Sequence, residues 1–444
     1  MLALTFVVVT ILTAGAGRWL FGRWFNHLTL YSLTWGAALF FYGLDLIHYY
    51  PITPTAWGYI LLAWAQILVG AAVVVAVARR APDRGREAPT DSAPATGALA
   101  TAILVLCALS AVALASQWVA LFARYGNLFT ALIQLANERY RERIAGQVAG
   151  DIPYIGAVAF SACALAGVYV ARTGRVTWTA ISPLVIVALQ GITLAGRMGI
   201  AMGTTLFVSA LLIAAPRRRA AGPRFWRPRT RAGWGLAMVG GGGAVLAGFL
   251  AVTLTRGLDI DLPGVDPALE RLATRLPVAA SLYSNVSAPP VAFSEYLKAG
   301  APRRAWGSYT FAPVRRALRR LGMGEGVPRY EEVYWTPLHS NVGTYLKNAY
   351  ADFGPAGVVL FPLLLSAVTA GLYLRTRRTG RTGTAVLTTH AFLVVIFSFN
   401  YNIMVLGTWL LSLVAGWITG NILDHHEGAV ATAAPAEPAE APAS

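Results

Sequence analysis

The stretch "GPAGVVLFPLLLSAVTAGLYL", residues 354–374, carries no charged side chain, and the arginine-rich string "RTRRTGR" (375–381) follows it at once. An α-helix rises about 1.5 Å per residue, so about 20 apolar residues cross the ~30 Å hydrocarbon core of a bilayer. Two further stretches of this kind occupy residues 57–78 and 97–122. The sequence therefore predicts a helical protein of the membrane.

The composition agrees with a membrane protein. Of the 444 residues 56% are hydrophobic and 13% are charged, whereas soluble chains carry about 25% charged residues. The net charge of +16 comes from arginines in short strings between apolar stretches, so membrane topology accounts for it and we expect no nucleic-acid partner. Cys107 and Cys163 lie inside apolar stretches without metal-ligand spacing, which indicates small core residues, and we expect no metal or cofactor.

We predict an all-α fold, a polytopic helical bundle with about eleven transmembrane helices and one large extracytoplasmic loop. The expected helices occupy 2–17, 28–47, 57–78, 97–122, 153–171, 178–196, 198–215, 232–254, 354–374, 384–400 and 402–422. A single helix over 178–215 would be about 57 Å long, nearly twice the bilayer, so we expect a hairpin that turns at Arg197.

Three basic segments are expected on the same side of the membrane: the loop that begins at Arg79, the string 216–231 with seven arginines, and 375–381. The positive-inside rule makes that side cytoplasmic, in the inner membrane of a cell. The chain then divides into eight helices in 1–254, an extracytoplasmic loop at 255–353 and three helices in 354–422. The Ala/Pro/Glu-rich tail at 423–444 is expected to be disordered in the cytoplasm.

The long loop at 255–353 is rich in Trp and Tyr and contains "FAPVRRALRRLG" (311–322). This segment alternates apolar residues with Arg315, Arg316, Arg319 and Arg320, a pattern typical of an amphipathic helix that lies along lipid headgroups. The arginines can bind phosphates, or the helix can serve as a surface lid without a catalytic role.

Ionisable residues at the ends of spans indicate a functional site, because they are costly near a membrane. Asp45 and His48 are spaced to share one face of a helix, either in a functional site or as a structural pair. Arg197 stands at a turn between two apolar helices, where its guanidinium can bind a substrate phosphate or the phosphates of ordinary lipids.

The string "YWTPLHSNVGTYLKNAYADFGPAG" (334–357) combines several polar side chains with the start of an apolar helix. His339 is the candidate general base, since a neutral imidazole accepts a proton near pH 7, although a solvated loop histidine is the alternative. Asn341 and Tyr345 can bind substrate by hydrogen bonds. Asp352 is either a second candidate base, together with Asp45, or the residue that caps the next helix.

Four stretches resemble the integral-membrane oligosaccharide repeat-unit polymerases, also called O-antigen polymerases. They are "LDLIHYYPITPTAW" (44–57), "GRMGIAMG" (196–203), "WGSYTFAPVRRALRRLGM" (306–323) and "SNVGTYLKNAYADFGPAGVVLF" (340–361). The string "LHSN" is also similar to the His-Asn entry of the related O-antigen ligases, although His339 here stands two residues before Asn341.

The resemblance implies an enzyme that moves a growing glycan from one polyprenyl pyrophosphate to a fresh lipid-linked repeat unit. Its partners would be polyprenyl-pyrophosphate-linked oligosaccharide, membrane lipid and a possible chain-length regulator. Arg197 and the four loop arginines, with His48, Asn341 and Tyr345, would bind substrate. His339, Asp352 or Asp45 would act as the base.

Four other functions remain open at this point. The first is an O-antigen ligase-like transferase, with the "LHSN" string as its signal. A flippase or exporter would move lipid-linked glycan without covalent chemistry, but such proteins often show internal repeats, and none is visible here. A glycosyltransferase with a single-sugar lipid donor would be expected to have acidic residues in its first loops, where this chain is basic. A structural or sensory membrane protein would not need the polar residues collected on one side.

Overall fold

The computed structural model describes residues 2–80, 96–145, 148, 150, 152, 154–215, 265–276, 278–301, 306–323, 334–337, 339–340 and 343–433. Within these residues the chain is almost entirely helical, and β1 and β2 form a short antiparallel pair. The elements are α1 (Leu2–Phe21), α2 (His27–Gly43), α3 (Pro54–Arg80), α4 (Thr96–Tyr125), η1 (Thr130–Gln134), α5 (Ala136–Ala145), η2 (Ile155–Ala157), α6 (Val158–Thr173), α7 (Trp178–Thr193), α8 (Arg197–Ala214), α10 (Pro267–Arg275), α11 (Val278–Lys298), α12 (Ala312–Arg320), β1 (Tyr334–Trp335), β2 (His339–Ser340), α13 (Tyr345–Phe353), α14 (Pro355–Thr379), α15 (Thr382–Phe397), η4 (Ile403–Val405) and α16 (Gly407–Ala433).

Within the part of the chain that the structure describes, six stretches of helix are long and apolar enough to cross a membrane: α1, α3, α4, η2 with α6, α8 and α14. The helices α7 and α15 are apolar but shorter. Helices occupy ten of the eleven ranges expected from the sequence, and 232–254 lies outside the described residues. The all-α membrane class is therefore confirmed, while the number of crossings stays a prediction.

The turn expected near Arg197 is present. The helix α7 ends at Thr193 and α8 begins at Arg197. Between them Ala195 takes a left-handed conformation with φ of 46°, which reverses the chain within four residues. A second break separates α13 from α14 at Gly354, whose φ is 65°. Glycine adopts such an angle without steric cost, and Pro355 starts the next helix at a position that needs no N–H.

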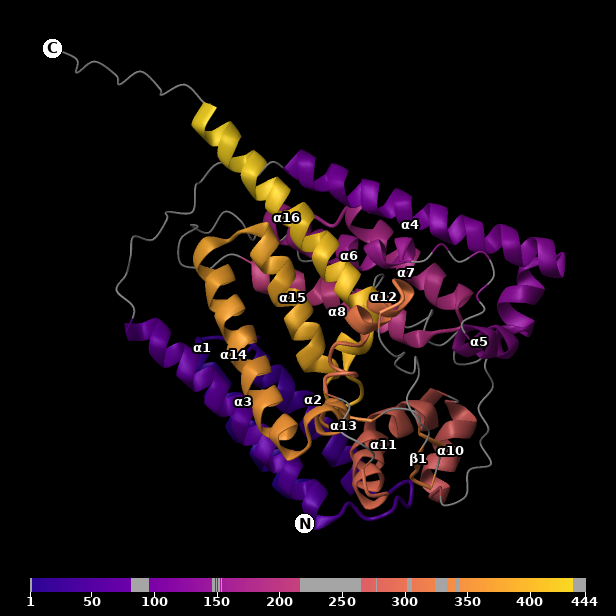
Figure 1. Ribbon diagram of the computed structural model, residues 1–444, viewed down its shortest axis with the longest axis vertical. Helices are drawn as coiled ribbons and strands as arrows, with labels where there is room; N and C mark the ends of the chain where they lie inside the picture. Colours follow the sequence, from indigo (N-terminus) through magenta and orange to yellow (C-terminus); the bar gives the residue numbers. More distant parts are fainter. Residues whose placement is uncertain are drawn as a thin grey trace.

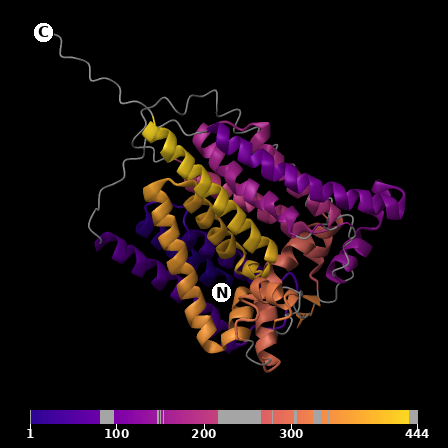
Figure 2. The ribbon, with the colours of Figure 1, turned by 45° about the horizontal axis from the view of Figure 1, so that its top comes forward.

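Among the described residues, buried apolar side chains form two large clusters. One joins α4, α6, α7, α8, α15 and α16 and includes both cysteines, as expected of small core residues. The other joins α1, α2, α3, α11, α13 and α14 around Trp35 and Tyr345. The helix α15 contributes to both, through Val386 and Val395 respectively. Figures 1 and 2 show α14, α15 and α16 side by side, where the two clusters meet.

The two ends of the bundle differ in character. At one end, the basic end, Arg378 donates to the carbonyl of Ala78 (3.1 Å) and Arg172 donates to Thr382 (2.8 Å). At the other, the loop end, α10, α11 and the strand pair gather below the bundle in Figure 1. There Ile47 pairs with Val265 across an isolated bridge. Residues expected on opposite sides of the membrane thus lie at opposite ends of the bundle.

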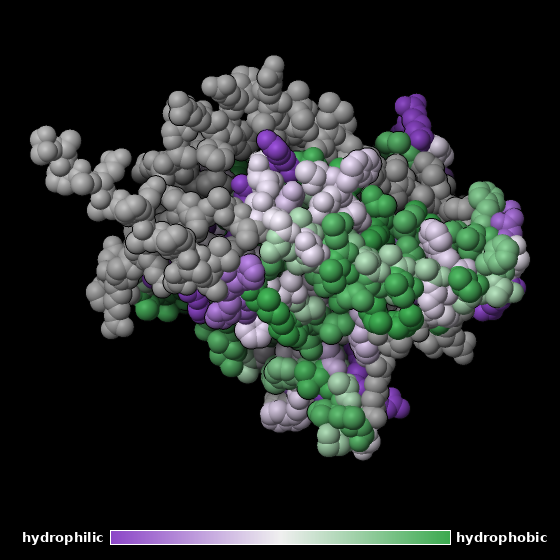
Figure 3. Space-filling view, turned by 90° about the horizontal axis from the view of Figure 1, so that it is seen from above, coloured by the Kyte–Doolittle hydropathy of each residue, from purple (hydrophilic) through white to green (hydrophobic). Residues whose placement is uncertain are grey.

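The surface between the ends is largely apolar. Figure 3 shows a broad hydrophobic area on the side along which α4 runs in Figure 1. Large apolar side chains of α4 are exposed there, among them Val105, Val112 and Val119. Because a soluble protein rarely exposes a continuous apolar face of this kind, lipid contact explains it.

Candidate functional site

Hydrogen bonds from polar side chains connect α8, α11 and the turn after α15 at the loop end, and α12 bonds to the same turn. We call the residues that donate or accept them the polar cluster, and its members are Arg197, Ser281, Asn285, Asn400 and Arg316. Arg197 opens α8 and donates from Nη1 to Ser281 Oγ of α11 (2.7 Å). One turn further along α11, Asn285 donates to the carbonyl of Ser281 (2.6 Å), and the carbonyl of Asn285 accepts from Asn400 (2.7 Å). The helix α11 therefore connects Arg197 to the turn that follows α15.

The same turn also holds α12, the amphipathic helix expected from the sequence. Arg316 Nη2 donates to the carbonyl of Val405 in η4 (2.9 Å), and Ala312 is fully buried against this segment. Arg315 donates to Ser308, while Arg319 is exposed and the side chain of Arg320 lies outside the described residues. The apolar Val314, Leu318 and Leu321 are exposed, which agrees with a helix lying along headgroups.

Asp352 has a different role from the ones expected. It lies in the last turn of α13, its side chain is fully buried, and Gly354 rather than Asp352 precedes α14. Its two carboxylate oxygens accept from the backbone N–H groups of Tyr309 (2.9 Å) and Thr310 (2.6 Å). The carboxylate therefore holds the turn that leads into α12. Because both oxygens are engaged and buried, Asp352 is poorly placed to take a proton from a substrate.

Asp45 and His48 do not share a helix face. The helix α2 ends at Gly43, and Asp45 has a φ of 54° in the turn beyond it. Their side chains still meet, with His48 Nδ1 3.5 Å from Asp45 Oδ2, and both are largely exposed.

The Asp45–His48 pair also lies apart from Arg197. The neighbouring Leu46 N–H donates to the hydroxyl of Tyr283 (3.0 Å), which is two residues from Ser281 on α11. Two residues correspond to about 200° around a helix. The helix α11 therefore stands between this pair and the polar cluster, although both lie at the loop end.

Tyr345 is a core residue. Its side chain is fully buried, and its hydroxyl lies 3.2 Å from the hydroxyl of Tyr31. The backbone of His339 pairs with Trp335 in the β1–β2 hairpin, but its side chain lies outside the described residues, as does the whole of Asn341. The roles expected for His339 and Asn341 stay predictions.

Lys347 is a buried cation that sequence reasoning missed. It lies on α13, only 4% exposed, with its Nζ 4.5 Å from the ring centre of Tyr334 and 5.9 Å from that of Tyr296. Cation–π contact stabilises an ammonium group that has left water. The sequence signal for a buried cation was a lysine inside "TYLKNAYADF", a stretch that leads directly into an apolar helix.

The polar cluster can bind anions and hydroxyl groups. It contains two guanidinium groups, which pair with phosphate oxygens through planar forks of N–H groups, together with a hydroxyl and two amides. Because the cluster lies at the ends of apolar helices, such an anion would be held at the depth of lipid headgroups.

The fold and this site define a polytopic helical membrane protein with a cationic polar site at one end. A scan against models of protein families finds no match, and searches of the curated proteins and of the solved structures find no similar protein.

Proposed function

We propose that this protein is a membrane glycosyltransferase that joins polyprenyl-pyrophosphate-linked oligosaccharide repeat units into a surface polysaccharide, on the extracytoplasmic face of the inner membrane. The observation that carries the proposal is Arg197. A guanidinium begins an apolar helix and is held by Ser281 of the long loop segment. Hydrogen bonds then connect α11 to the turn after α15, and a second guanidinium, Arg316, bonds to the η4 segment of that turn. A pyrophosphate on a lipid needs cations at this depth, and two arginines supply them.

In this proposal Arg197 and Arg316 bind the pyrophosphate of the donor and stabilise the negative charge that grows on it as the glycosidic bond breaks. His339 takes the proton of the acceptor hydroxyl as the new bond forms. Asp352 acts indirectly, because it holds the turn before α12 and so positions Arg316. The Asp45–His48 pair is the second candidate base.

The test is complementation in cells that lack their own repeat-unit polymerase and that make the lipid-linked unit of the native gene cluster. The intact chain is expected to give a ladder of surface glycan on a gel. Arg197→Ala and His339→Ala are expected to leave single capped units. Arg271→Ala is the matched control, since Arg271 is an exposed arginine of α10 at the loop end whose Nε donates to the carbonyl of Pro267 within its own helix.

Other outcomes would contradict parts of the proposal. A ladder retained by His339→Ala would remove that residue as the base and favour the Asp45–His48 pair. If the intact chain gives no ladder, yet labelled lipid-linked units reach the outer face only in its presence, the protein is a transporter.

A further inference from the structure

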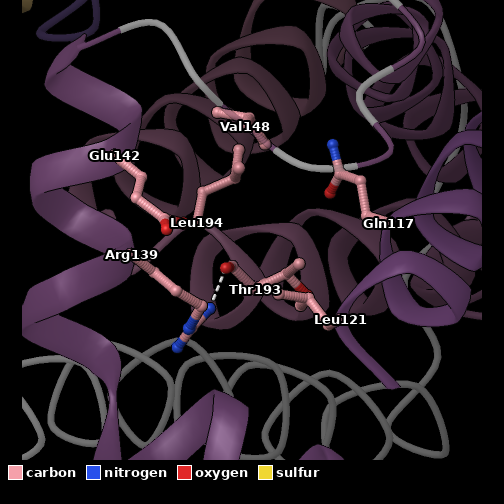
Figure 4. A pocket seen from close by; sticks show the side chains of 7 residues that line it. All are labelled: Gln117, Leu121, Arg139, Glu142, Val148, Thr193 and Leu194. Atoms are coloured by element: carbon pink, nitrogen blue, oxygen red, sulfur yellow. Dashed lines mark hydrogen bonds between the residues drawn. The ribbon is translucent and has the colours of Figure 1, made fainter. Parts of the chain in front are cut away.

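The described part of the chain contains two buried arginine or lysine side chains, Arg139 and Lys347, each 4% exposed. Arg139 of α5 bonds to backbone groups: its Nη1 donates to the carbonyls of Ile192 (3.2 Å) and Thr193, and its Nη2 donates to that of Leu132 (2.7 Å). Figure 4 shows the guanidinium beside Thr193. The last carbonyls of a helix carry partial negative charge, so Arg139 stabilises the end of α7. Lys347 has a different environment.

Lys347 belongs to α13, a short helix that is anchored in the core of the bundle. Tyr345 and Leu346, the two residues before it, are fully buried. The N–H of Tyr345 donates to the carbonyl of Ser398, directly after α15 (3.0 Å). The hydroxyl of Ser398 accepts from the ring N–H of Trp35 on α2 (2.9 Å). Because these contacts fix α13, a side chain on this helix can hold a neighbouring loop segment in place.

The ammonium group of Lys347 meets two aromatic rings that belong to other elements. Its Nζ lies 4.5 Å from the ring centre of Tyr334 in β1 and 5.9 Å from that of Tyr296 in α11. The two rings meet edge to face, with their centres 6.0 Å apart and their planes at 89°. An ammonium over the face of an aromatic ring is attracted to it, and the attraction is stronger where water is excluded. Lys347 therefore joins α13, β1 and α11 at one point.

The hairpin that carries Tyr334 depends on anchors of this kind. β1 and β2 have two residues each, with Tyr334 opposite Ser340 and Trp335 opposite His339. A two-stranded hairpin on its own is marginally stable in water. Successive residues of a strand point to opposite sides. Tyr334 is half-buried and Ser340 is buried, whereas Trp335 is 59% exposed. The hairpin therefore meets the bundle through the side of Tyr334.

A buried charge at this position is costly. An ammonium group loses its hydration on burial, whereas a methionine there would pack against the same rings without that cost. What the ammonium adds is attraction to the ring faces, which fixes where Tyr334 lies. On the same helix, Asp352 holds the turn before α12 through two backbone N–H groups. One short helix thus holds the hairpin of His339 and the segment that leads to Arg316.

We propose that Lys347 is a positioning residue that fixes the β1–β2 hairpin, and with it the backbone of His339, against α13 through the ring of Tyr334, an inference that rests on the proposed function for the role of His339 as the base. Without the ammonium, the hairpin keeps the hydrogen bond from the Tyr50 N–H to the Thr336 carbonyl (3.1 Å), but it opens more often.

Hydrogen–deuterium exchange of the detergent-purified chain measures this opening without the reaction. Lys347→Met keeps the length of the side chain and removes the charge. Loss of a desolvated cation–π contact corresponds to a roughly 30-fold larger open population. Exchange in β1 and β2 is expected to rise by that factor, while α13 keeps its rates. Tyr334→Leu is expected to have the same effect, and Tyr334→Phe, which keeps a ring, little effect. Lys298→Met is the matched control, because Lys298 is the other lysine of the chain and lies exposed on α11.

A double variant distinguishes this contact from general packing. If the ammonium acts through the Tyr334 ring, adding Lys347→Met to Tyr334→Leu changes the exchange of the hairpin no further. Equal exchange in Lys347→Met and the unchanged chain overturns the proposal, as does additivity in the double variant. Faster exchange throughout α13 overturns it too, because Lys347 would then stabilise its own helix.

The complementation assay tests the link to the reaction separately. Lys347→Met is expected to lose most of the glycan ladder. Lys347→Arg and Tyr334→Phe, which keep the cation and the ring, are expected to retain it, as is Lys298→Met. Faster exchange of the hairpin with an unchanged ladder would overturn the positioning of His339 by Lys347. If the intact chain gives no ladder, the proposed function fails, and the exchange measurement still decides whether Lys347 fixes the hairpin.

Discussion

Replacing Asp352 by Asn tests whether a single carboxylate positions α12. The substitution keeps the size and shape of the side chain. It removes the charge and turns one of two acceptor oxygens into an NH₂ donor. Because both oxygens accept backbone N–H groups of the turn before α12, the variant leaves one of those N–H groups facing another donor.

The magnitude follows from these two bonds. A hydrogen bond to a charged group contributes about 1.5–3 kcal/mol, and a buried donor without an acceptor costs about 1–3 kcal/mol. The two effects overlap at one site, so we expect opening of the turn at 306–311 to become easier by about 3 kcal/mol. This corresponds to about a 150-fold larger open population. Most of the remaining bundle keeps its contacts, so the loss should be local.

Hydrogen–deuterium exchange of the detergent-purified protein measures this directly. Backbone N–H groups at 306–320 are expected to exchange faster in Asp352→Asn, while those of α6 and α8 keep the rates of the unchanged protein. Asp45→Asn is the matched control, because that carboxylate is largely exposed, and it is expected to leave 306–320 unaffected. Unchanged exchange at 306–320 in Asp352→Asn would refute the role assigned to Asp352, and so would a rise spread over every helix.

Two further substitutions test the packing of the bundle. Gly70→Ala is expected to lower the midpoint of thermal unfolding, because a Cβ there would meet the carbonyl oxygen of Leu363 on α14 at 2.5 Å. Gly371→Ala has nothing within 4 Å of its Cβ. It is expected to raise the midpoint, because alanine stabilises a helix by ~1 kcal/mol relative to glycine. Equal midpoints for the two variants would contradict the close contact of α3 and α14. Asp424→Ala is expected to cost about 1–2 kcal/mol, because this carboxylate accepts from the backbone N–H groups of Thr382 (2.7 Å) and Gly383 (3.0 Å) at the start of α15. Hydrogen exchange measures this effect and is expected to be faster only in the first turn of α15. An unchanged rate there would contradict the role of Asp424 in holding the start of this helix.

The positions of the helices were predictable because one physical rule dominates them. A helix in lipid must satisfy its backbone internally and match the thickness of the bilayer, so length and hydropathy mark it in a single sequence. The separation of the basic end from the loop end followed from the arginine strings in the same way. The breaks at 193–197 and at Gly354 were visible because glycine and proline have strong local preferences.

The membership of the site was only partly predictable. Arg197 was expected to matter, but its partner Ser281 stands 84 residues away in the chain. Asp45 and His48 were correctly identified as neighbours, but nothing in the sequence shows which face of α11 each element meets. Lys347 and Arg139 were missed, since a cation gains a role inside a protein only through the groups that surround it.

By itself the sequence determined that this is a helical membrane protein, where its helices lie, and which end of the bundle carries polar chemistry, because each of these depends on local composition and on the thickness of the bilayer. Only the tertiary structure decided that Asp352 holds a backbone turn, that α11 separates the Asp45–His48 pair from the polar cluster, and that Lys347 meets the ring of Tyr334 in the β1–β2 hairpin. These features depend on contacts between segments far apart in the chain. The free energy of such contacts comes from burial and geometry, which no single segment contains.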